Sequence, residues 1–409
     1  MIDDTQLIEI FKTEYSKLIA VLCQYYGVTE VQLAEDIVSE TFLKAMKTWA
    51  HKGVPDKPTA WLRKVAVNNL KDYYKRSKIY KEKILVNLES KTNSIQPEEI
   101  SNDIVEDSQL KMIFVVCNLR IRDKAKICLA LRILCGFNIN EIAKALLSND
   151  EAINKILYRA KKKISENGIL NTNLKLENYN QGYDTVLRII YLLFNEGYYS
   201  SIREHNVREE ICWEALRLAL LLSKIQVEQQ TAAYALIALI SFHSSRIHAR
   251  MNSSNEDLLF NEQDRAKWNK PLIEKGKKYL NLASHGSVIS KYHLEAAIAF
   301  WHTTDNPKKW DNILQLYDRL LTIEYSPIVA LNRAYVLSKT NSVHEAIKEA
   351  NKLELDGNNH YYCLLAELHK INGNNQMERK YLREALKCTI KKSEQNLINK
   401  KLEIASRLQ

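Results

Sequence analysis

The chain has 409 residues and a net charge of +10, and its length allows two to four domains with cores of their own. Gly and Pro are scarce, at 10 and 6 residues, so the composition predicts an all-α protein and excludes a sheet protein with many glycine turns. The seven cysteines are scattered and form no CxxC pair, which excludes a zinc ribbon or a disulfide framework and favours a reducing cytoplasm.

The chain also lacks the signals of membrane targeting and of catalysis. The N-terminus is acidic and amphipathic, and no run of about 18 apolar residues occurs, so we expect a cytoplasmic protein without membrane contact. His243 and His248 stand five residues apart, which does not place them on one helix face as metal ligands. We expect no metal, no cofactor and no catalytic site.

Positive charge is concentrated in two places. Residues 1–50 carry 4 Lys and Arg against 8 Asp and Glu, whereas residues 51–87 carry 10 against 3 and residues 144–163 carry 6 against 2. An acidic segment followed by two basic clusters predicts two contacts to a polyanion, with an acidic face left for another partner. Lysine-rich drift of the composition is the alternative.

Helical periodicity and its interruptions divide the chain into parts. We expect a helical block over residues 1–80, a polar linker over 81–105, a second helical block over 106–168 and a long helical part over 181–409. The segment ENGILNTNLKLENYNQ, between the last two, is expected to be a hinge.

The last part contains a weak repeat. Ala334 and Ala346 stand twelve residues apart, as do the small residues of a helix-turn-helix repeat of about 34 residues. Ala366 and Ala385 follow in a similar phase, and Glu378 breaks the pattern. The spacing predicts a degenerate tetratricopeptide-like array, and generic helical hairpins are the alternative.

The segment LAEDIVSETFLKAMKTW predicts an amphipathic helix. Its periodicity puts Leu33, Ile37, Phe42, Leu43, Met46 and Trp49 on an apolar face, and Glu35, Asp36, Ser39, Glu40 and Lys44 on the opposite, polar face.

The next helix, PTAWLRKVAVNNLKDYYKR, mixes cationic, aromatic and amide side chains. Cations meet phosphates, aromatic rings stack on unpaired bases, and amides read base edges. This mixture favours the capture of melted or kinked DNA over plain duplex binding.

The stretches AEDIVSETFLKAM and AWLRKVAVNNLKDYYKR resemble domain two, a helical bundle, of the bacterial extracytoplasmic-function sigma factors of the sigma-70 family. The resemblance implies that the first helix docks on core RNA polymerase through Asp36, Glu40, Thr41 and Phe42. It implies that residues 51–76 hold the flipped-out bases of the promoter −10 element. The DNA-binding side chains implied there are Trp61, Arg63, Lys64, Asn68, Asn69, Lys71, Tyr73, Lys75 and Arg76.

Residues 123–163 have the pattern of a helix-turn-helix. Capping boxes at Asn138 to Glu141 and at Ser148 to Glu151 predict helices that begin near 139 and 149. The predicted buried positions are Ile142, Ala143, Leu146, Ile153, Leu157 and Ala160. The outward set that could enter a major groove is Glu151, Ala152, Asn154, Lys155, Tyr158, Arg159 and Lys162. A purely structural three-helix hairpin is the alternative.

This block resembles sigma domain four, which implies that it reads the promoter −35 element. Ile156 stands where the family commonly carries an arginine. We therefore expect one DNA contact to be missing or to move to Lys155.

Four later stretches, YLLFNEGYYS, LLFNEQDRAKW, YHLEAAIAFWH and LYDRLLTIEYSPIVALNRAYVL, resemble the subgroup with a long helical, tetratricopeptide-like C-terminal extension. Gly197 is expected to end a packed helix as a left-handed cap, with Glu196 bonding the backbone or pairing with an arginine. Asp264, Arg265 and Trp268 are expected to form a second internal anchor. A catalytic role for Glu196 is the alternative, but no nucleophile or metal-ligand cluster accompanies it.

Together these features predict an alternative sigma factor with core RNA polymerase and promoter DNA as partners. The extension is expected to gate or support the DNA-binding domains and to bind a regulatory protein or peptide. The alternative is a helix-turn-helix regulator with a helical-repeat sensor that binds duplex DNA without polymerase. The acidic-apolar helix over residues 33–49 is a feature that such a regulator does not need.

Overall fold

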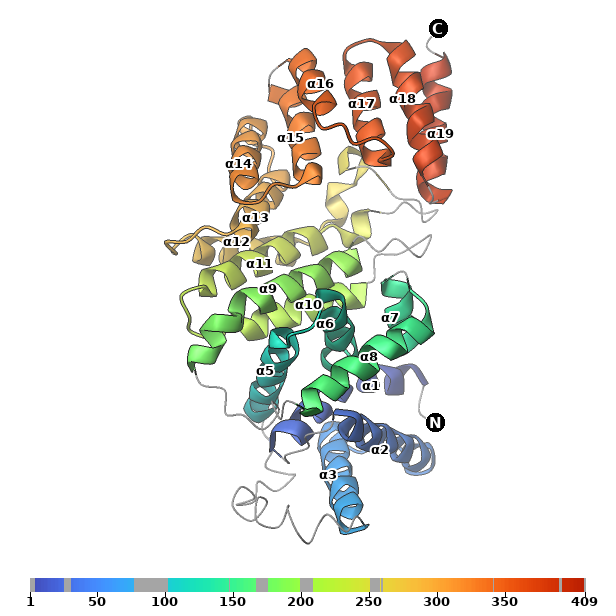
Figure 1. Cartoon of the computed structure of the whole chain (residues 1–409), viewed down its shortest axis with the longest axis vertical. Coiled ribbons are helices and arrows are strands. Elements are labelled where there is room, and N and C mark those ends of the chain that lie inside the picture. The colour runs from blue at the N-terminus through green and yellow to red at the C-terminus, as the bar shows by residue number, and fades with distance from the viewer. Residues whose placement is uncertain are drawn as a thin grey trace. The chain divides into compact units, whose positions relative to one another are not determined.

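The computed structural model is helical throughout, and the part of the chain that it describes contains no strand, as the composition predicts (Figure 1). It describes residues 4–25, 31–76, 102–146, 148–166, 176–198, 209–250, 258, 260–340, 342–389 and 392–407. The chain divides into two compact units. Unit 1 comprises residues 1–196 and 224–227, and unit 2 comprises residues 197–223 and 228–409.

Unit 1 contains both segments that the sequence assigns to DNA binding. Helix α1 packs along α5 and against α2, so buried side chains of α1 join the first helical block to the second. The helices of the unit are α1 (Asp4–Tyr25), α2 (Val31–Lys52), α3 (Pro58–Arg76), α5 (Asn102–Asn118), α6 (Asp123–Leu129), the π-helix η3 (Ala130–Leu134), α7 (Ile139–Ala145), α8 (Asp150–Glu166) and most of α9 (Leu176–Tyr198).

The last residues of the expected hinge are helical, because α9 already begins at Leu176, and residues 167–175 lie outside the described residues. Tyr179 and Tyr183 of α9 pack against Phe114 of α5, with ring centroids 4.7 and 6.5 Å apart. These aromatic contacts extend the second helical block into α9. The expected linker over residues 81–105 lies mostly outside the described residues.

Gly197 does not end a helix, so the predicted left-handed cap is wrong. Helix α9 runs through Gly197 to Tyr198, and the glycine has no positive φ. A Cβ atom there would lie 2.9 Å from Cβ of Ile211 and 3.0 Å from the backbone N of Cys212. Glycine is needed because helix α10 (Glu209–Leu222) approaches closely. The side chain of Glu196 lies outside the described residues.

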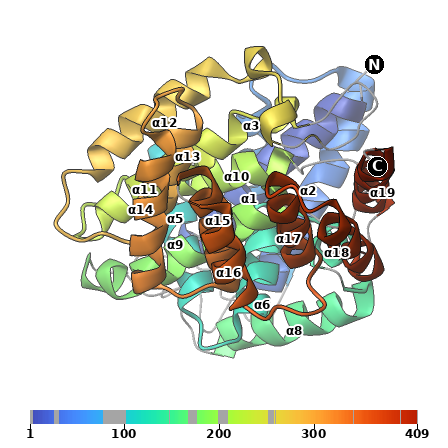
Figure 2. The ribbon, with the colours of Figure 1, turned by 90° about the horizontal axis from the view of Figure 1, so that it is seen from above.

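Unit 2 is a succession of helices in which each helix from α13 to α19 packs against the next (Figure 2). Helix α11 is apolar on nearly all sides and is buried against its neighbours. Besides α10, the helices are α11 (Gln230–Ser244), the 3-10 turns η5 (Ile247–Ala249), η6 (Phe260–Glu262) and η7 (Arg265–Lys267), α12 (Lys270–Ala283), α13 (Lys291–His302), α14 (Lys309–Ile323), α15 (Pro327–Thr340), α16 (Val343–Asn351), α17 (Asn359–Ile371), α18 (Asn375–Cys388) and α19 (Lys392–Arg407).

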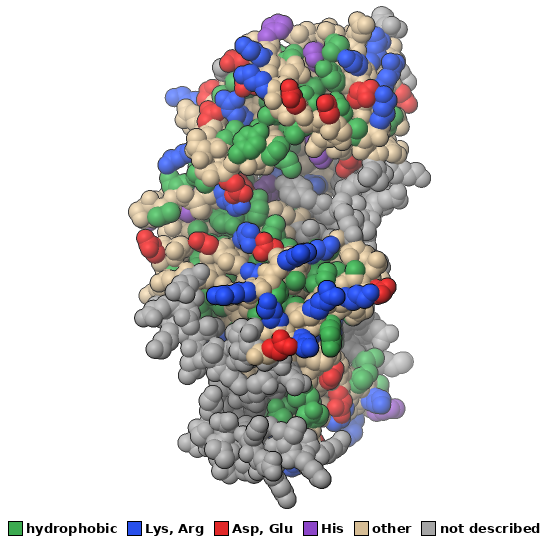
Figure 3. Space-filling model, in the orientation of Figure 1, with side chains coloured by type: hydrophobic (Ala, Val, Ile, Leu, Met, Phe, Trp, Pro, Cys, Tyr) green, Lys and Arg blue, Asp and Glu red, His purple; other side chains and the backbone are tan. Residues whose placement is uncertain are grey.

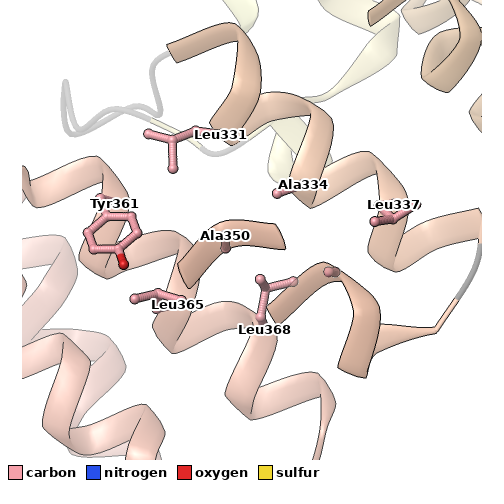
Figure 4. Packing of buried hydrophobic residues seen from close by; sticks show 8 residues of the cluster. Leu331, Ala334, Leu337, Ala350, Tyr361, Leu365 and Leu368 are labelled. Atoms are coloured by element: carbon pink, nitrogen blue, oxygen red, sulfur yellow. The ribbon is translucent and has the colours of Figure 1, made fainter. Parts of the chain in front are cut away.

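The small residues that suggested a repeat lie inside this packing. Ala334 and Ala346 are buried together with Leu331, Leu365 and other apolar side chains of α15, α16 and α17 (Figure 4). Small side chains allow two helices to approach closely at such positions. The tetratricopeptide-like assignment itself stays a prediction.

Glu378 is buried where the repeat pattern calls for a small residue, with 6% of its surface exposed. Burial raises the pKa of its carboxyl group, although nearby Lys370 acts in the opposite direction. The irregularity in the pattern therefore corresponds to a buried ionisable group in α18.

Candidate nucleic-acid and polymerase interface

The exposed face of α2 differs from the predicted face in three residues. Glu35, predicted on the polar face, is buried, whereas Leu43 and Met46, predicted on the apolar face, are 56% and 50% exposed. Asp36 and Glu40 are exposed, as predicted. The surface offered by α2, here called the α2 strip, therefore combines two carboxylates with two large apolar side chains: Asp36, Glu40, Leu43 and Met46.

Thr41 and Phe42, which the resemblance assigns to polymerase contact, point into the protein. The hydroxyl of Thr41 donates to the carbonyl oxygen of Ile37 at 2.8 Å. The ring of Phe42 packs edge-on against Phe11 of α1, with centroids 4.7 Å apart. In this conformation both residues hold α2 in place and neither can touch a partner.

Helix α3 exposes a row of polar and cationic side chains. Lys64, Asn68, Lys71 and Lys75 are all exposed, and their spacing of four, three and four residues puts them on one helix face. Tyr73, 45% exposed, lies beside the row. We call these five residues the α3 row.

Asn69 is not available for reading bases, contrary to the expectation. It is 5% exposed. Its amide nitrogen donates to the hydroxyl of Thr41 at 3.2 Å, and its oxygen accepts from the ammonium group of Lys44. Asn69 thus ties α3 to α2.

The remaining predicted −10 residues are less exposed than the α3 row. Trp61 is half-buried against Trp49 of α2, with ring centroids 5.3 Å apart. Arg63 is also half-buried, and the side chain of Arg76 lies outside the described residues.

The turn between α7 and α8 is fixed by two caps. Asn138 and Glu141 form the predicted capping box, with backbone-to-side-chain hydrogen bonds of 2.9 and 2.8 Å. Helix α8 begins one residue later than predicted, because Asn149 and not Ser148 accepts from the backbone N–H of Ala152, at 2.8 Å.

The face of α8 predicted to enter a major groove is confirmed as the exposed one. Tyr158 is 70% exposed, and Figure 3 shows Lys and Arg side chains gathered over this helix. Lys155 pairs with Glu151 at 2.6 Å, and Ile156 is half-buried. Ala152, which was also predicted to face outward, is half-buried. The exposed residues, here called the α8 face, are Glu151, Asn154, Lys155, Tyr158, Arg159 and Lys162.

The buried side of α8 matches the prediction equally well. Ile153, Leu157 and Ala160 are buried, as are Ile142 and Ala143 of α7. The last predicted core residue of α7, Leu146, is half-buried.

A buried carboxylate joins α2 to the helix-turn-helix block. The side chain of Glu35 is 3% exposed, and one oxygen lies 2.7 Å from Nε of Arg132 in η3. The other oxygen pairs with the ammonium group of Lys161 in α8. The hydroxyl of Tyr15 in α1 donates to Glu35 at 3.2 Å. We call these four residues the Glu35 clasp.

The partners of Glu35 are held in turn. Arg132 donates to the carbonyl oxygen of Phe137 at 3.1 Å and lies 5.3 Å from the ring centroid of Tyr15. Burial raises the pKa of Tyr15, and the negative charge of Glu35 raises it further. Three donors converge on one carboxylate, so its buried charge is compensated.

The described residues contain no group of three or more His, Cys, Asp or Glu side chains that could hold a metal ion. His243 is half-buried in α11, whereas His248 lies exposed with its Nε2 3.7 Å from a carboxylate oxygen of Glu209. Among the helices that the structure describes, none is long and apolar enough to cross a membrane.

Replacing Glu35 should destabilise unit 1. The variant Glu35→Ala leaves the half-buried charges of Arg132 and Lys161 without their buried counter-charge, and breaking a buried pair costs up to about 3–5 kcal/mol. Chemical denaturation of the full chain measures the loss. The control Glu40→Gln removes an exposed pair with Lys44 and should cost less than about 1 kcal/mol. An equal loss of unfolding free energy in the two variants would contradict a stabilising role for the Glu35 clasp.

The chain resembles known proteins in two segments. Residues 10–79 match the family described as sigma-70 region 2, and residues 183–284 match a family of unknown function (DUF6596). Thus α2 and α3, with their exposed surfaces, lie in the sigma-70 segment, and α9 to α12 lie largely in the second.

Two relatives extend this picture. Over 349 residues the chain is 29% identical to "Uncharacterized protein R00370" of Rhizobium meliloti (strain 1021), a match that spans 83% of this chain and 82% of the relative. Over 139 residues it is 30% identical to "ECF RNA polymerase sigma factor BldN" of Streptomyces coelicolor, which spans 33% of this chain and 51% of that protein. No solved structure matches the chain. The chain therefore carries a sigma-70 region 2, is similar to an extracytoplasmic-function sigma factor over a third of its length, and continues in a long C-terminal extension.

Proposed function

We propose that this sigma factor binds core RNA polymerase, recognises the −10 and −35 elements of its promoters and initiates transcription. The observation that supports this most strongly is the set of three chemically distinct surfaces on unit 1. The α2 strip is acidic and apolar, the α3 row is cationic with an aromatic ring, and the α8 face is a cationic helix surface after a tight turn.

The α2 strip has the character of a protein-binding surface. Leu43 and Met46 expose about half of their surfaces to water, and burying them against a partner removes that apolar area. Asp36 and Glu40 flank them and would orient a partner that carries cations. We assign core-polymerase binding to this strip and a positioning role to Thr41 and Phe42.

The α3 row suits an unpaired DNA strand. Lysines on one face follow a phosphate backbone, and stacking of a base on Tyr73 would contribute about 1–3 kcal/mol. We therefore assign −10 recognition to Lys64, Asn68, Lys71, Tyr73 and Lys75, with Trp61 supporting the helix from its half-buried place.

The α8 face suits a major groove of duplex DNA. Arg159 forms no ion pair with any described residue, whereas Lys155 is already paired with Glu151. We therefore assign the larger share of the −35 contact to Arg159.

The proposed function requires the two DNA-binding surfaces to separate. Elements at −10 and −35 lie about 25 base pairs apart, or about 85 Å along B-DNA at about 3.4 Å per base pair. Helix α8 has 17 residues and spans about 25 Å. The Glu35 clasp fastens this helix directly to α2, so we infer that the clasped conformation belongs to the free chain and opens on the promoter.

Run-off transcription with purified core polymerase tests the function as a whole. On a template with a promoter taken from upstream of the chain's own gene, we expect a discrete transcript that depends on this chain. Unit 2 supplies none of the three surfaces, so we propose that it regulates or supports unit 1. Truncation after Glu196, which removes unit 2 together with the short segment 224–227 of unit 1, should change the yield. No transcript with the full chain counts against the function, and an unchanged yield after truncation counts against regulation by unit 2.

Charge reversal on the α2 strip should weaken polymerase binding. The double variant Asp36→Lys, Glu40→Lys keeps the buried side of α2 unchanged, so we expect a native circular dichroism spectrum and at least a tenfold loss of affinity for core polymerase. The control Glu403→Lys changes an exposed carboxylate of α19 and should bind normally. If the double variant binds core polymerase as tightly as the wild type, the assignment of core-polymerase binding to the α2 strip is wrong.

Removal of cations from the α8 face should weaken −35 binding in a salt-dependent way. Loss of one phosphate contact lowers the slope of log affinity against log salt by about 1. We expect a greater loss for Arg159→Ala than for Lys155→Ala, because Lys155 leaves an ion pair to bind DNA. Fluorescence anisotropy with a −35 duplex at several salt concentrations measures both, and identical slopes for all three proteins would contradict the assignment.

A further inference from the structure

Unit 2 contains a cluster of cations and aromatic rings that takes no part in the proposed DNA or polymerase surfaces. Arg246 follows α11, and Lys309 begins α14. The guanidinium carbon of Arg246 lies 4.8 Å from the ring centroid of Phe260, and Nζ of Lys309 lies 5.5 Å from the same centroid. Two cations thus share one ring despite their mutual repulsion.

Further rings and a third cation complete the cluster. Arg246 and Arg265 lie 5.8 and 5.3 Å from the ring centroid of Trp268. Lys309 lies 5.3 Å from the ring of Trp310. The ring of His302 packs edge-on between Phe260 and Trp310, with centroids 4.9 and 5.8 Å away. The stretch LLFNEQDRAKW supplies Phe260, Arg265 and Trp268.

Among the described residues that act on Lys309, positive charge exceeds negative charge. Lys309 is only 9% exposed and forms no ion pair with any described residue. Among the described residues, the carboxylate whose charge acts on Lys309 is that of Asp305, and it is paired with Arg265. Burial lowers the pKa of Lys309, the charge of Arg265 lowers it further, and Asp305 only partly opposes this. A buried ammonium group without a counter-ion is unfavourable unless another group supplies the negative charge.

Two polar atoms on rings of this cluster also lack a hydrogen-bond partner among the described residues. Nε1 of Trp268 is buried without an acceptor, in a residue that is 6% exposed, and Nδ1 of His302 is likewise unsatisfied among the described residues. Burial, followed by the charge of Lys309, lowers the pKa of His302 to about 3, so this ring is neutral at pH 7. An indole N–H can only donate, so it calls for an incoming acceptor oxygen.

We propose that this cluster, the Lys309 site, binds a phosphate group. Around Lys309, two further cations, Arg246 and Arg265, face one described carboxylate, Asp305, and this excess of positive charge suits a dianionic phosphate better than a single carboxylate. The group could be free phosphate or the phosphate of a small nucleotide, and both present the same oxygens. Unit 2 would then be a ligand-responsive part of the chain, a property that the proposed role in transcription does not require.

Thermal unfolding of the full-length chain, titrated with inorganic phosphate at constant ionic strength, tests the proposal. A ligand that binds only the folded state raises the midpoint with concentration. We expect phosphate to raise the unfolding midpoint of the wild type until the site is saturated, and chloride to leave the midpoint unchanged. In Lys309→Met, phosphate should no longer raise the midpoint. The matched control Lys308→Met alters the exposed neighbour and should keep the rise. Without phosphate, Lys309→Met should be no less stable than the wild type, because it removes an uncompensated buried charge.

Equilibrium dialysis of the folded proteins with radiolabelled phosphate provides a readout that does not depend on unfolding. One bound phosphate per wild-type chain and none per Lys309→Met chain supports the site. A parallel arm with adenosine monophosphate identifies the source: tighter binding than free phosphate indicates a nucleotide, and equal or weaker binding indicates phosphate itself. No binding to the wild type, or equal binding to both proteins, overturns the proposal.

Discussion

A single buried carboxylate constrains how unit 1 is put together. Removing Glu35 from water is unfavourable, and the cost is offset only when Arg132 and Lys161 approach it from two other elements. One side of α8 must therefore face α2, and the opposite side, with Tyr158 and Arg159, is left to solvent. The exposure of the α8 face, to which we assign DNA binding, follows from the burial of the clasp.

The same constraint explains how a sigma factor can keep its surfaces ready and yet inactive. The clasp covers neither the α2 strip nor the α8 face, so both can meet their partners. It limits only the distance between them. Binding free energy from polymerase and DNA must exceed the free energy of the clasp before the two surfaces can separate.

Much of unit 1 could be predicted from the sequence, because its helices are amphipathic and its caps are local. The alternation along α8 identified its buried and exposed sides, and Asn138 with Glu141 marked the start of α7. The predicted exposure of Glu35 is wrong, because glutamate is ordinarily exposed and this one is held in the interior by Arg132 and Lys161. Glu35 lies in the stripe of Val31, Val38 and Phe42, at helical spacing, and that spacing was the available signal.

Other features depend on contacts that no local pattern contains. Arg132 and Lys161 stand 97 and 126 residues from Glu35 in the chain. Gly197 is required by the approach of Ile211, not by a helix end, and a glycine fits both situations equally well. The charge excess around Lys309 likewise arises from segments that only the fold of unit 2 brings together.

The distance between α2 and α8 tests the account most directly. Fluorescent labels on non-native amino acids at Lys47 and Glu166, both exposed, would report it by energy transfer in the free chain and in the complex with core polymerase and promoter DNA. The account predicts high transfer in the free chain and its near-complete loss in a transcriptionally active complex. Undiminished transfer in an active complex, or failure of the chain to join core polymerase at all, would contradict it.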